Sequence, residues 1–362
     1  MSVSSQLGLR YGLLNSQFKL ALAALCLSCI ASAATFSGLY TVNVALLSDP
    51  GLTQIEATRI AMGQLLTRIT GRPDAAQELI FLNLLDQAGD FVLEVGKLDR
   101  DTLTVTFDAL SIVRELRTLD QPVWGPERPL TLMWVAVDAG FGQRGILSAQ
   151  FPEAHNEPVI AELKDRLRQE LFNVADVRGL PVTLPLLDLE DMASLSFADI
   201  WGGFNDRIRK ASARYHADAI LSGRVRVTAF GTNVQWTLIR GDKERGITTA
   251  TLGEGLDRLA EIYAEDFGAI GKPRTVQIVV LDINERSHYF NALSYMNSLS
   301  LLESVRVVQF GPDGLLLRVT WRGDLGVFER MLSLDNVLTP VITTRSSNNP
   351  GVETRLTFRL VH

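Results

Sequence analysis

The stretch Leu130-Thr-Leu-Met-Trp-Val-Ala-Val137 is apolar at almost every position. A strand that is covered on both faces has this pattern, whereas a strand with one solvated face alternates between apolar and polar residues. Farther along the chain, an apolar residue recurs at every fourth position from 159 to 171, which predicts a helix. Strands are expected at 219–227 and 233–239, and a closing helix at 255–267. We therefore expect an α/β domain with a mixed sheet.

Segments rich in proline and glycine lie on both sides of this region. Residues 122–129 contain three prolines and one glycine, a composition that excludes a helix or a central strand. Residues 268–273 form a second break of this kind. We therefore expect an α+β domain at 34–121, the α/β domain at 130–268 and a third domain at 274–362.

The first of these domains is expected to combine a small sheet with amphipathic helices. The expected elements are strands at 39–47, 91–95 and 103–107 and helices at 55–69, 75–84 and 109–119. Ile55, Met62, Leu65, Leu66 and Ile69 fall on one stripe of the first helix. An apolar stripe at this spacing normally faces the core.

The third domain follows the order β-α-β-β-α-β, which is typical of the ferredoxin-like fold. The expected elements are strands at 276–283, 304–310, 315–321 and 354–361, helices at 288–299 and 325–334, and an extra hairpin arm at 341–344. Phe310 and Trp321 would lie on adjacent strands, where RNA-binding domains of this fold stack bases. Because the surrounding sequence lacks an RNA-binding motif, we favour structural packing, or pairing of a sheet edge with another protein.

The first 33 residues have the pattern of a secretory signal peptide. Arg10 and Lys19 precede an apolar run at 20–30, and the segment ends in Ala31-Ser-Ala33. The run is shorter than the roughly 20 apolar residues that a spanning helix needs. We expect cleavage after Ala33 and a periplasmic protein without a stable membrane span. A lipoprotein attached through Cys29 and a retained N-terminal anchor are the alternatives.

Cleavage would change both the charge and the thiol content of the chain. It would leave 329 residues with 33 basic and 41 acidic side chains, and it would remove both cysteines, Cys26 and Cys29. An acidic chain without a basic stripe argues against nucleic acid as a partner. Zinc and iron–sulfur sites of the ordinary kind are disfavoured without thiols, since the four histidines share no metal-binding spacing. We expect no cofactor and no metal.

A candidate binding site consists of Asp188, Glu190, Asp191 and Trp201, which follow an expected strand near 180–187. Ligands of open α/β sheets collect beyond the carboxyl ends of strands, and paired carboxylates can hold a cation or act as acid and base. Acids in this position also cap helices, and Trp201 with its flanking glycines also suits a core turn. We assign no catalytic residue.

Motifs of known enzymes are weak in this sequence. Gly140-Phe-Gly-Gln-Arg-Gly145 matches a dinucleotide-binding string, but prolines follow it and the next helix starts too late to hold a pyrophosphate. We expect a loop there, with the roles of a lid or a partner-binding finger left open. No nucleophile elbow and no P-loop occur, so an enzyme is the less favoured reading.

Four segments carry a resemblance to a known family. They are Pro122-Val-Trp-Gly-Pro-Glu-Arg-Pro129, Leu184-Pro-Leu-Leu-Asp-Leu-Glu-Asp191, Phe197-Ala-Asp-Ile-Trp-Gly-Gly203 and Ala211-Ser-Ala-Arg-Tyr-His-Ala-Asp-Ala219. Together they resemble an exported proteobacterial family called domain of unknown function 2066. The resemblance implies export and assigns no activity to any residue. In its order of elements, the middle region is also similar to small α/β domains of periplasmic envelope-assembly proteins, an analogy at the level of the fold.

These observations predict an exported, soluble envelope protein that works as a non-enzymatic interaction or assembly factor with a protein partner. The alternative is a ligand-binding protein or hydrolase with an acidic site at the strand ends of the middle domain.

Overall fold

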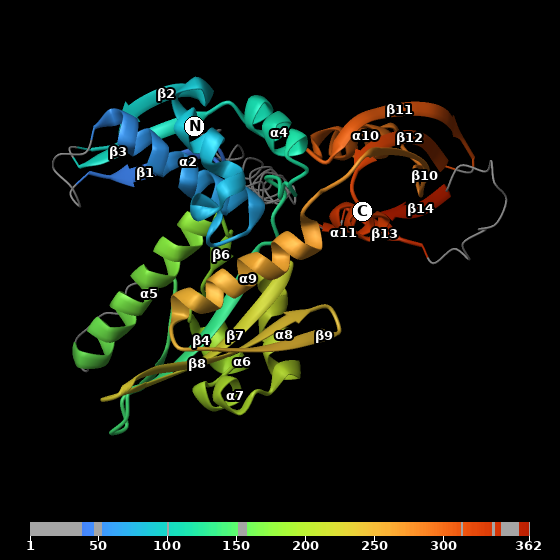
Figure 1. Cartoon of the computed structure of the whole chain (residues 1–362). Helices are drawn as coiled ribbons and strands as arrows, with labels where there is room; N and C mark the ends of the chain where they lie inside the picture. Colours follow the sequence, from blue (N-terminus) through green and yellow to red (C-terminus); the bar gives the residue numbers. More distant parts are fainter. Residues whose placement is uncertain are drawn as a thin grey trace, which may run out of the picture. The chain divides into compact units, whose positions relative to one another are not determined.

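Three sheets with their covering helices make up the mixed α/β structure of this protein (Figure 1). The computed structural model describes residues 38–46, 53–99, 101–150, 158–312, 314–334, 337–341 and 355–361. All of these residues belong to one unit that spans residues 34–362. The predicted signal peptide at 1–33 and most of the hairpin arm predicted at 341–344 lie outside the described residues.

The N-terminal part is an antiparallel sheet packed against one long helix. Its elements are β1 (Thr41–Ala45), α2 (Gln54–Thr70), α3 (Leu82–Asp86), β2 (Val92–Lys97), β3 (Thr102–Phe107) and α4 (Ala109–Thr118), in the sheet order β1-β3-β2. Thr53 and Glu56 form a capping box at the start of α2, and Gly71 ends the helix with a φ of 75°. Met62, Leu65 and Ile69 are buried as predicted, but Ile55 is 83% exposed.

The middle sheet is built around the apolar stretch at residues 130–137. Its strands are β4 (Thr131–Asp138), β5 (Arg144–Ile146), β6 (Val182–Thr183), β7 (Ala219–Thr228), β8 (Gly231–Arg240) and β9 (Lys243–Thr249), in the order β5-β4-β7-β8-β9 with β6 also paired to β4. All eight residues of β4 are buried, as the apolar run predicted. The β4–β7 and β4–β6 pairs are parallel and the others antiparallel, so the sheet is mixed.

Helices on both sides explain why β4 is buried on both faces. One face packs against α5 (Pro158–Arg178) and α9 (Leu252–Phe267), and the core there includes Met133 and Leu256. The other face packs against α6 (Leu189–Ser194), α7 (Phe197–Gly202) and α8 (Asn205–Ser212), with Trp134 and Ile208 in its core.

Residues 140–145, the dinucleotide-like string, form the hairpin that joins β4 to β5, since Asp138 pairs with Arg144 across it. The string therefore lies in a β-hairpin, without the strand-to-helix turn that a dinucleotide site requires.

Among the described residues, the C-terminal sheet contains the four predicted strands and a short fifth strand just before the predicted hairpin arm. Its elements are β10 (Pro273–Leu281), α10 (Arg286–Ser298), β11 (Leu302–Gly311), β12 (Gly314–Arg322), α11 (Leu325–Leu332), β13 (Leu338–Pro340) and β14 (Arg355–Leu360), in the order β11-β12-β10-β14-β13. The strand β14 is parallel to β10 and lies between it and β13. The simple ferredoxin-like arrangement is therefore not confirmed. Trp321 is buried and stacks on Phe328 at 4.4 Å, so its ring cannot stack on a base.

The predicted linker at 122–129 is buried or half-buried along its length and makes contacts with all three parts of the chain. The Trp124 N–H donates to the Ile69 carbonyl at 2.7 Å. Arg128 Nη1 donates to the Arg178 carbonyl at 3.0 Å, and the Glu127 carboxylate accepts bonds of 2.6 Å from the Ser300 N–H and hydroxyl. Prolines prevent helix formation here, but the extended chain can be buried because its polar groups find partners.

Within the ranges that the structure describes, no helix is both long enough and apolar enough to cross a membrane.

Candidate functional site

The three predicted acids lie at the start of α6 and share one arginine. Asp188 precedes the helix and caps it, since its carboxylate accepts a bond of 3.0 Å from the Asp191 N–H. Arg214 binds Asp188 with both terminal nitrogens, at 2.8 and 2.9 Å. Arg214 Nη1 also lies 3.1 Å from Asp191 Oδ1 and 3.5 Å from Glu190 Oε2. The structure thus brings the three carboxylates together around a guanidinium.

Tyr215 completes this network from the other side. Its hydroxyl donates to Asp191 Oδ2 at 2.5 Å and accepts a bond of 2.9 Å from the Leu186 N–H. The Leu187 N–H donates to the same Asp191 oxygen at 2.9 Å. Because Asp191 is buried, these bonds fix the chain before α6 against the turn that follows α8.

Asp188 and Tyr215 in this network have pKa values far from neutral pH. Hydrogen bonds from Arg214, and then from the backbone of Asp191, lower the pKa of Asp188 to about 2. Burial, and then the bond to Asp191, raises the pKa of Tyr215 to about 12. A general acid or base works best with a pKa near the working pH, so Asp188 and Tyr215 are suited to holding structure at neutral pH and poorly suited to proton transfer.

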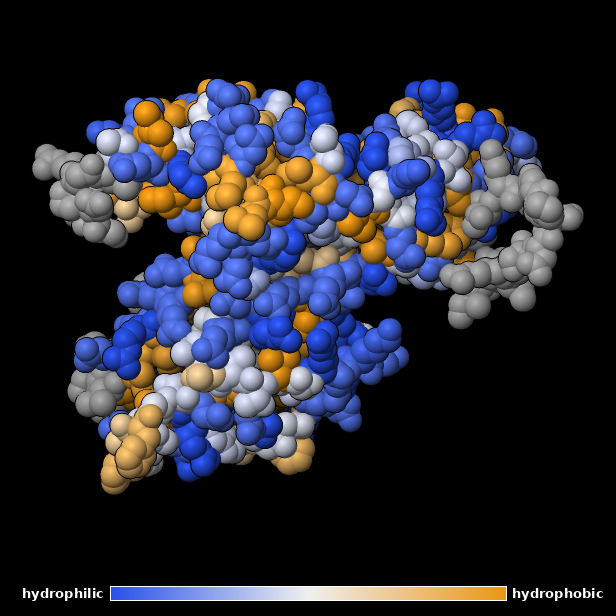
Figure 2. Space-filling view, viewed as in Figure 1, coloured by the Kyte–Doolittle hydropathy of each residue, from blue (hydrophilic) through white to orange (hydrophobic). Residues whose placement is uncertain are grey.

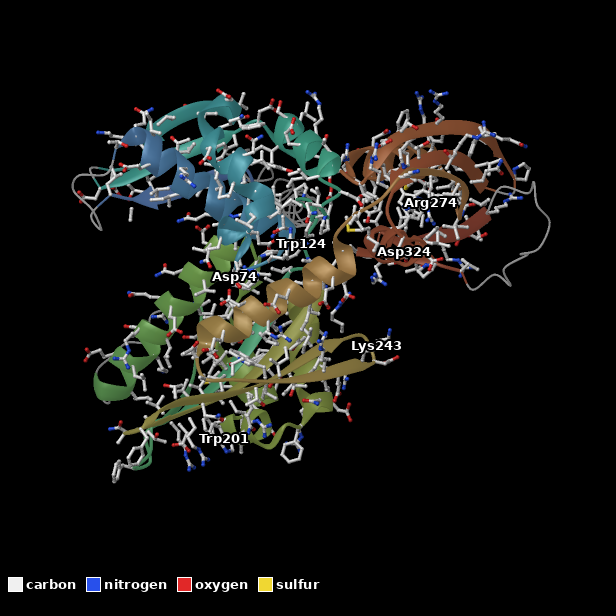
Figure 3. The ribbon with its side chains drawn as sticks, in the orientation of Figure 1. Asp74, Trp124, Trp201, Lys243, Arg274 and Asp324 are labelled. Atoms are coloured by element: carbon white, nitrogen blue, oxygen red, sulfur yellow. The ribbon has the colours of Figure 1, made fainter. Side chains whose placement is uncertain are left out.

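Trp201 belongs to a separate cluster at the end of α7 (Figure 3). Its ring stacks on Phe197 with centroids 5.4 Å apart and an angle of 16°. The Arg226 guanidinium lies 5.3 Å from the Trp201 ring, and the Arg144 guanidinium lies 5.8 Å from the Phe197 ring. Trp201 therefore contacts arginines and a phenylalanine, whereas the three acids contact Arg214 and Tyr215.

Metal ligands do not gather anywhere in the part of the chain that the structure describes: it contains no group of three histidine, cysteine or acidic side chains placed to hold an ion.

A wide cleft of about 1100 Å³ is lined by residues of β8, β9, α9 and α11. Its lining contains both acidic and basic side chains, and some of them have ion-pair or hydrogen-bond partners. Arg240 pairs with Asp266, whose carbonyl accepts a bond of 2.8 Å from Arg330. Glu244 pairs with Arg209 at 2.5 Å. Because acidic and basic side chains are mixed in its lining, the cleft has little net charge to offer a ligand, and the candidate site lies elsewhere.

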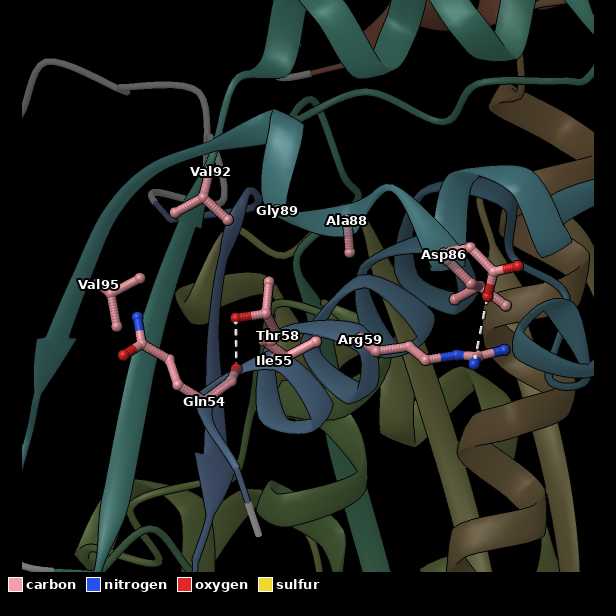
Figure 4. Close-up of a pocket in the computed structure, with 10 residues that line it drawn as sticks. Gln54, Ile55, Thr58, Arg59, Asp86, Ala88, Gly89, Val92 and Val95 are labelled. Atoms are coloured by element: carbon pink, nitrogen blue, oxygen red, sulfur yellow. Dashed lines mark hydrogen bonds and ion pairs between the residues drawn. The ribbon is translucent and has the colours of Figure 1, made fainter.

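The candidate site is a groove of about 550 Å³ between α2 and β2 in the N-terminal part (Figure 4). Its walls are mainly apolar and consist of Ile55, Leu85, Ala88, Val92 and Val95. Several polar groups on its rim already have partners: Arg59 pairs with Asp86 at 3.2 Å, and the Thr58 hydroxyl donates to the Gln54 carbonyl at 2.8 Å. An apolar ligand surface could therefore enter without leaving these groups unpaired.

The groove exposes side chains that would normally be covered by the core. Val95 pairs with Val105, which is fully buried, so both lie on the core side of the sheet. Val95 nevertheless remains 36% exposed. Ile55 continues the buried stripe of α2 toward its N-terminus, where the stripe reaches the groove. Hydrophobic side chains also gather on the visible face of this part of the molecule (Figure 2).

The groove lies beside a free strand edge. The strand β2 comes last in the order β1-β3-β2, so it has a neighbour on one side only among the strands that the structure describes. The backbone groups on such an edge can pair with an added strand. An added strand would direct every second side chain toward the groove, because side chains alternate between the two faces of a sheet.

Comparison with known proteins gives one match. Residues 33–125 match the model of a domain of unknown function (DUF8605), and this range contains the groove. The match supports an uncharacterised domain at this place, but it does not support the particular family that the sequence resembled. No curated protein and no solved structure matches the chain.

Sequence reasoning missed the groove, Arg214 and Tyr215. The groove could have been suspected from Ile55, because it lies seven residues, about two turns, before Met62, the next residue of the predicted stripe. Arg214 and Tyr215 are more than twenty positions away from the acids that they bind and carry no local signal.

Proposed function

We propose that this chain is an exported, non-enzymatic protein of the cell envelope that binds an extended segment of another protein. The observation that carries the proposal is the groove between α2 and β2. Apolar side chains from the core side of the sheet are exposed in this groove, next to a free strand edge. Strand addition uses both features: the edge supplies backbone hydrogen bonds, and the groove supplies a pocket for alternate side chains.

The groove also defines the chemistry of the partner. Its walls are mainly aliphatic, and the charges of Arg59 and Asp86 on its rim neutralise each other. The partner segment is therefore extended, with apolar residues at alternate positions and without a charge that faces the groove. Complete burial of one aliphatic side chain contributes about 1.5–3 kcal/mol, so Ile55 alone could change affinity about ten-fold or more.

The proposal also covers the localisation of the protein and its domain boundaries. Export through residues 1–33 would bring the chain to the periplasm, where a protein partner is available and nucleic acid is not. We propose domains at 34–121, 130–268 and 274–362, with the last one a ferredoxin-like variant in which β14 is inserted beside β10.

A peptide selection tests the binding role. A library of random peptides displayed on phage is panned against the full chain, and binding of the enriched peptides is then measured with variants. We expect sequences with alternating apolar residues. Their affinity should fall about ten-fold or more in Ile55→Asp, a substitution that folding tolerates because Ile55 is 83% exposed.

Leu93→Asp is the matched control, since Leu93 is an exposed apolar residue of the same strand as Val95 that does not line the groove. Amide hydrogen exchange should show slower exchange in β2 when a selected peptide binds. Equal binding by wild type and Ile55→Asp, or an equal loss in Leu93→Asp, would rule out the groove as the binding site.

A further inference from the structure

Two phenylalanines project from neighbouring hairpin tips of the middle sheet. Phe141 lies between β4 and β5, and Phe230 lies between β7 and β8. The strands β4 and β7 are parallel neighbours, with Asp138 opposite Arg226 near their carboxyl ends, so both tips lie at the same end of the sheet (Figure 1). The exposures of Phe141 and Phe230 are 107% and 102%, which means that each ring is entirely surrounded by solvent.

The backbone at the first tip holds its ring outward at a conformational cost. Phe141 has a φ of 51° between Gly140 and Gly142, whose φ values are 79° and 82°. The left-handed region is unfavourable for a bulky side chain, and glycine or asparagine would fit more easily. Bonds of 2.9 Å from the Gly140 N–H to Asp138 and from the Ala139 N–H to the Gln143 carbonyl fix this turn.

Basic side chains lie directly behind the two tips. Arg144 follows the first tip and Arg226 precedes the second, and their guanidinium groups pack on Phe197 and Trp201. Arg224 donates to the Trp201 carbonyl at 3.2 Å. Three arginines therefore lie near this end of the sheet, although the whole chain has a net charge of −6. Arg144 is paired with Asp138 at 3.1 Å, whereas Arg224 and Arg226 contact Trp201.

We infer that this end of the middle sheet docks on an anionic lipid surface, with Phe141 and Phe230 inserted among the lipids and the arginines at the headgroups. Apolar side chains that enter the boundary between headgroups and acyl chains, with cations behind them, are the features that bind proteins to membrane surfaces. Trp201 and the arginine stems are amphipathic and suit the headgroup level.

The arrangement favours lipid over protein as the partner. Adjacent strands are about 4.8 Å apart, so the centres of the two hairpins are about 10 Å apart across the sheet. Each ring protrudes alone, whereas binding energy at protein interfaces is concentrated in packed, water-excluding clusters. A fluid lipid surface accepts separate protruding rings without a matching shape. The inference does not depend on the groove of the N-terminal part.

Vesicle binding tests the inference. The full chain is mixed with vesicles of phosphatidylglycerol and phosphatidylethanolamine, and the bound fraction is measured by sedimentation. Replacement of both rings, Phe141→Ser with Phe230→Ser, should lower the partition coefficient about ten-fold. All variants share residues 1–33, so the difference between wild type and variant reports on the tips alone.

Two matched variants distinguish the effect of the tip rings from the effects of exposed apolar side chains elsewhere and of positive charge. Leu110→Ser with Leu189→Ser removes two other exposed apolar side chains and should leave binding unchanged. Arg226→Gln should weaken binding to anionic vesicles, with little effect on vesicles of phosphatidylcholine alone, and added salt should reduce the difference. Equal losses in the tip variant and the leucine variant would overturn the inference.

A photo-crosslinking residue at position 230 identifies the partner class in cells. Phospholipid adducts, detected by mass spectrometry, are the expected result. A discrete protein adduct without lipid adducts, or the absence of vesicle binding by the wild-type chain, would overturn the inference. Thermal melting should be the same for wild type and Phe230→Ser, since the replaced ring is fully exposed.

Discussion

At the scale of single residues, Arg128 makes an extensive set of buried contacts. Its guanidinium donates to the carbonyls of Gly125, Trp124, Arg68, Arg178 and Gly179, at distances from 2.8 to 3.1 Å. It also lies 3.7 Å from the Trp124 ring. Burial, and then repulsion from Arg68, lowers its pKa well below the ordinary value for arginine. The five carbonyls replace the water that a charged group would otherwise need.

We predict that Arg128→Met lowers the free energy of unfolding by about 3–5 kcal/mol, because it leaves buried carbonyls without donors. Arg59→Met is the control: it removes a surface ion pair with Asp86 and should cost less than about 1 kcal/mol. Urea unfolding of the full chain measures both values. Similar losses in the two variants would mean that Arg128 has no special structural role.

The environment of Arg128 also shows what the sequence could not reveal about residues 122–129. The prolines correctly excluded a helix and a central strand from this segment. Its burial depends on Arg178 and Ser300, which are far away in the chain. Composition reports local backbone preferences, and it carries no information on which distant carbonyls will surround a guanidinium.

At the scale of elements, α6 depends on Asp188 in two ways. The carboxylate caps the helix, and it pairs with Arg214. Asn is as good as Asp at the cap position, whereas Ala is poor. Asp188→Asn therefore removes the ion pair and keeps the cap, and Asp188→Ala removes both.

We predict that, at neutral pH, the free energy of unfolding is highest for wild type, lower for Asp188→Asn and lowest for Asp188→Ala. The pKa of Asp188 is about 2 in the folded chain and 3.8 ordinarily, so its charge stabilises the fold above about pH 4. This contribution is lost as the pH falls from 4 to 2. Wild type and Asp188→Asn should then converge, while Asp188→Ala stays lower. Urea midpoints across this pH range provide the measurement, and a constant gap between wild type and Asp188→Asn would contradict the ion-pair role.

Elements differ in how well the sequence predicted them. The strand β4 was predictable because its apolar run reflects burial on both faces. The stripe of α2 was predictable from Met62 to Ile69 and wrong at Ile55, where the helix extends past the core. The parallel direction of β14 against β10 was not predictable, since strand direction depends on pairing between residues that are far apart in the chain.

At the scale of the whole molecule, the mixed α/β class follows from the alternation of helical and strand periods along the chain. The extent of the core does not follow from it. One apolar core runs without a break from residues of the middle sheet, such as Met133, to residues of the C-terminal sheet, such as Phe358. The boundary expected at 268–273 was predicted from turn residues. Such residues interrupt local secondary structure, but the apolar core can continue across them.

Export is a property of the whole chain and yields the last prediction. If residues 1–33 are removed, the protein in the cell envelope begins at Ala34 and contains no cysteine. Mass spectrometry should therefore find an N-terminal peptide that starts at Ala34, and a maleimide should label the precursor but not the mature protein. Ala33→Phe should block cleavage, because the cleavage site requires small residues, and should preserve maleimide labelling. A lipid-modified chain that starts at Cys29 would identify a lipoprotein, and a chain that keeps Met1 in the cytoplasm would contradict export.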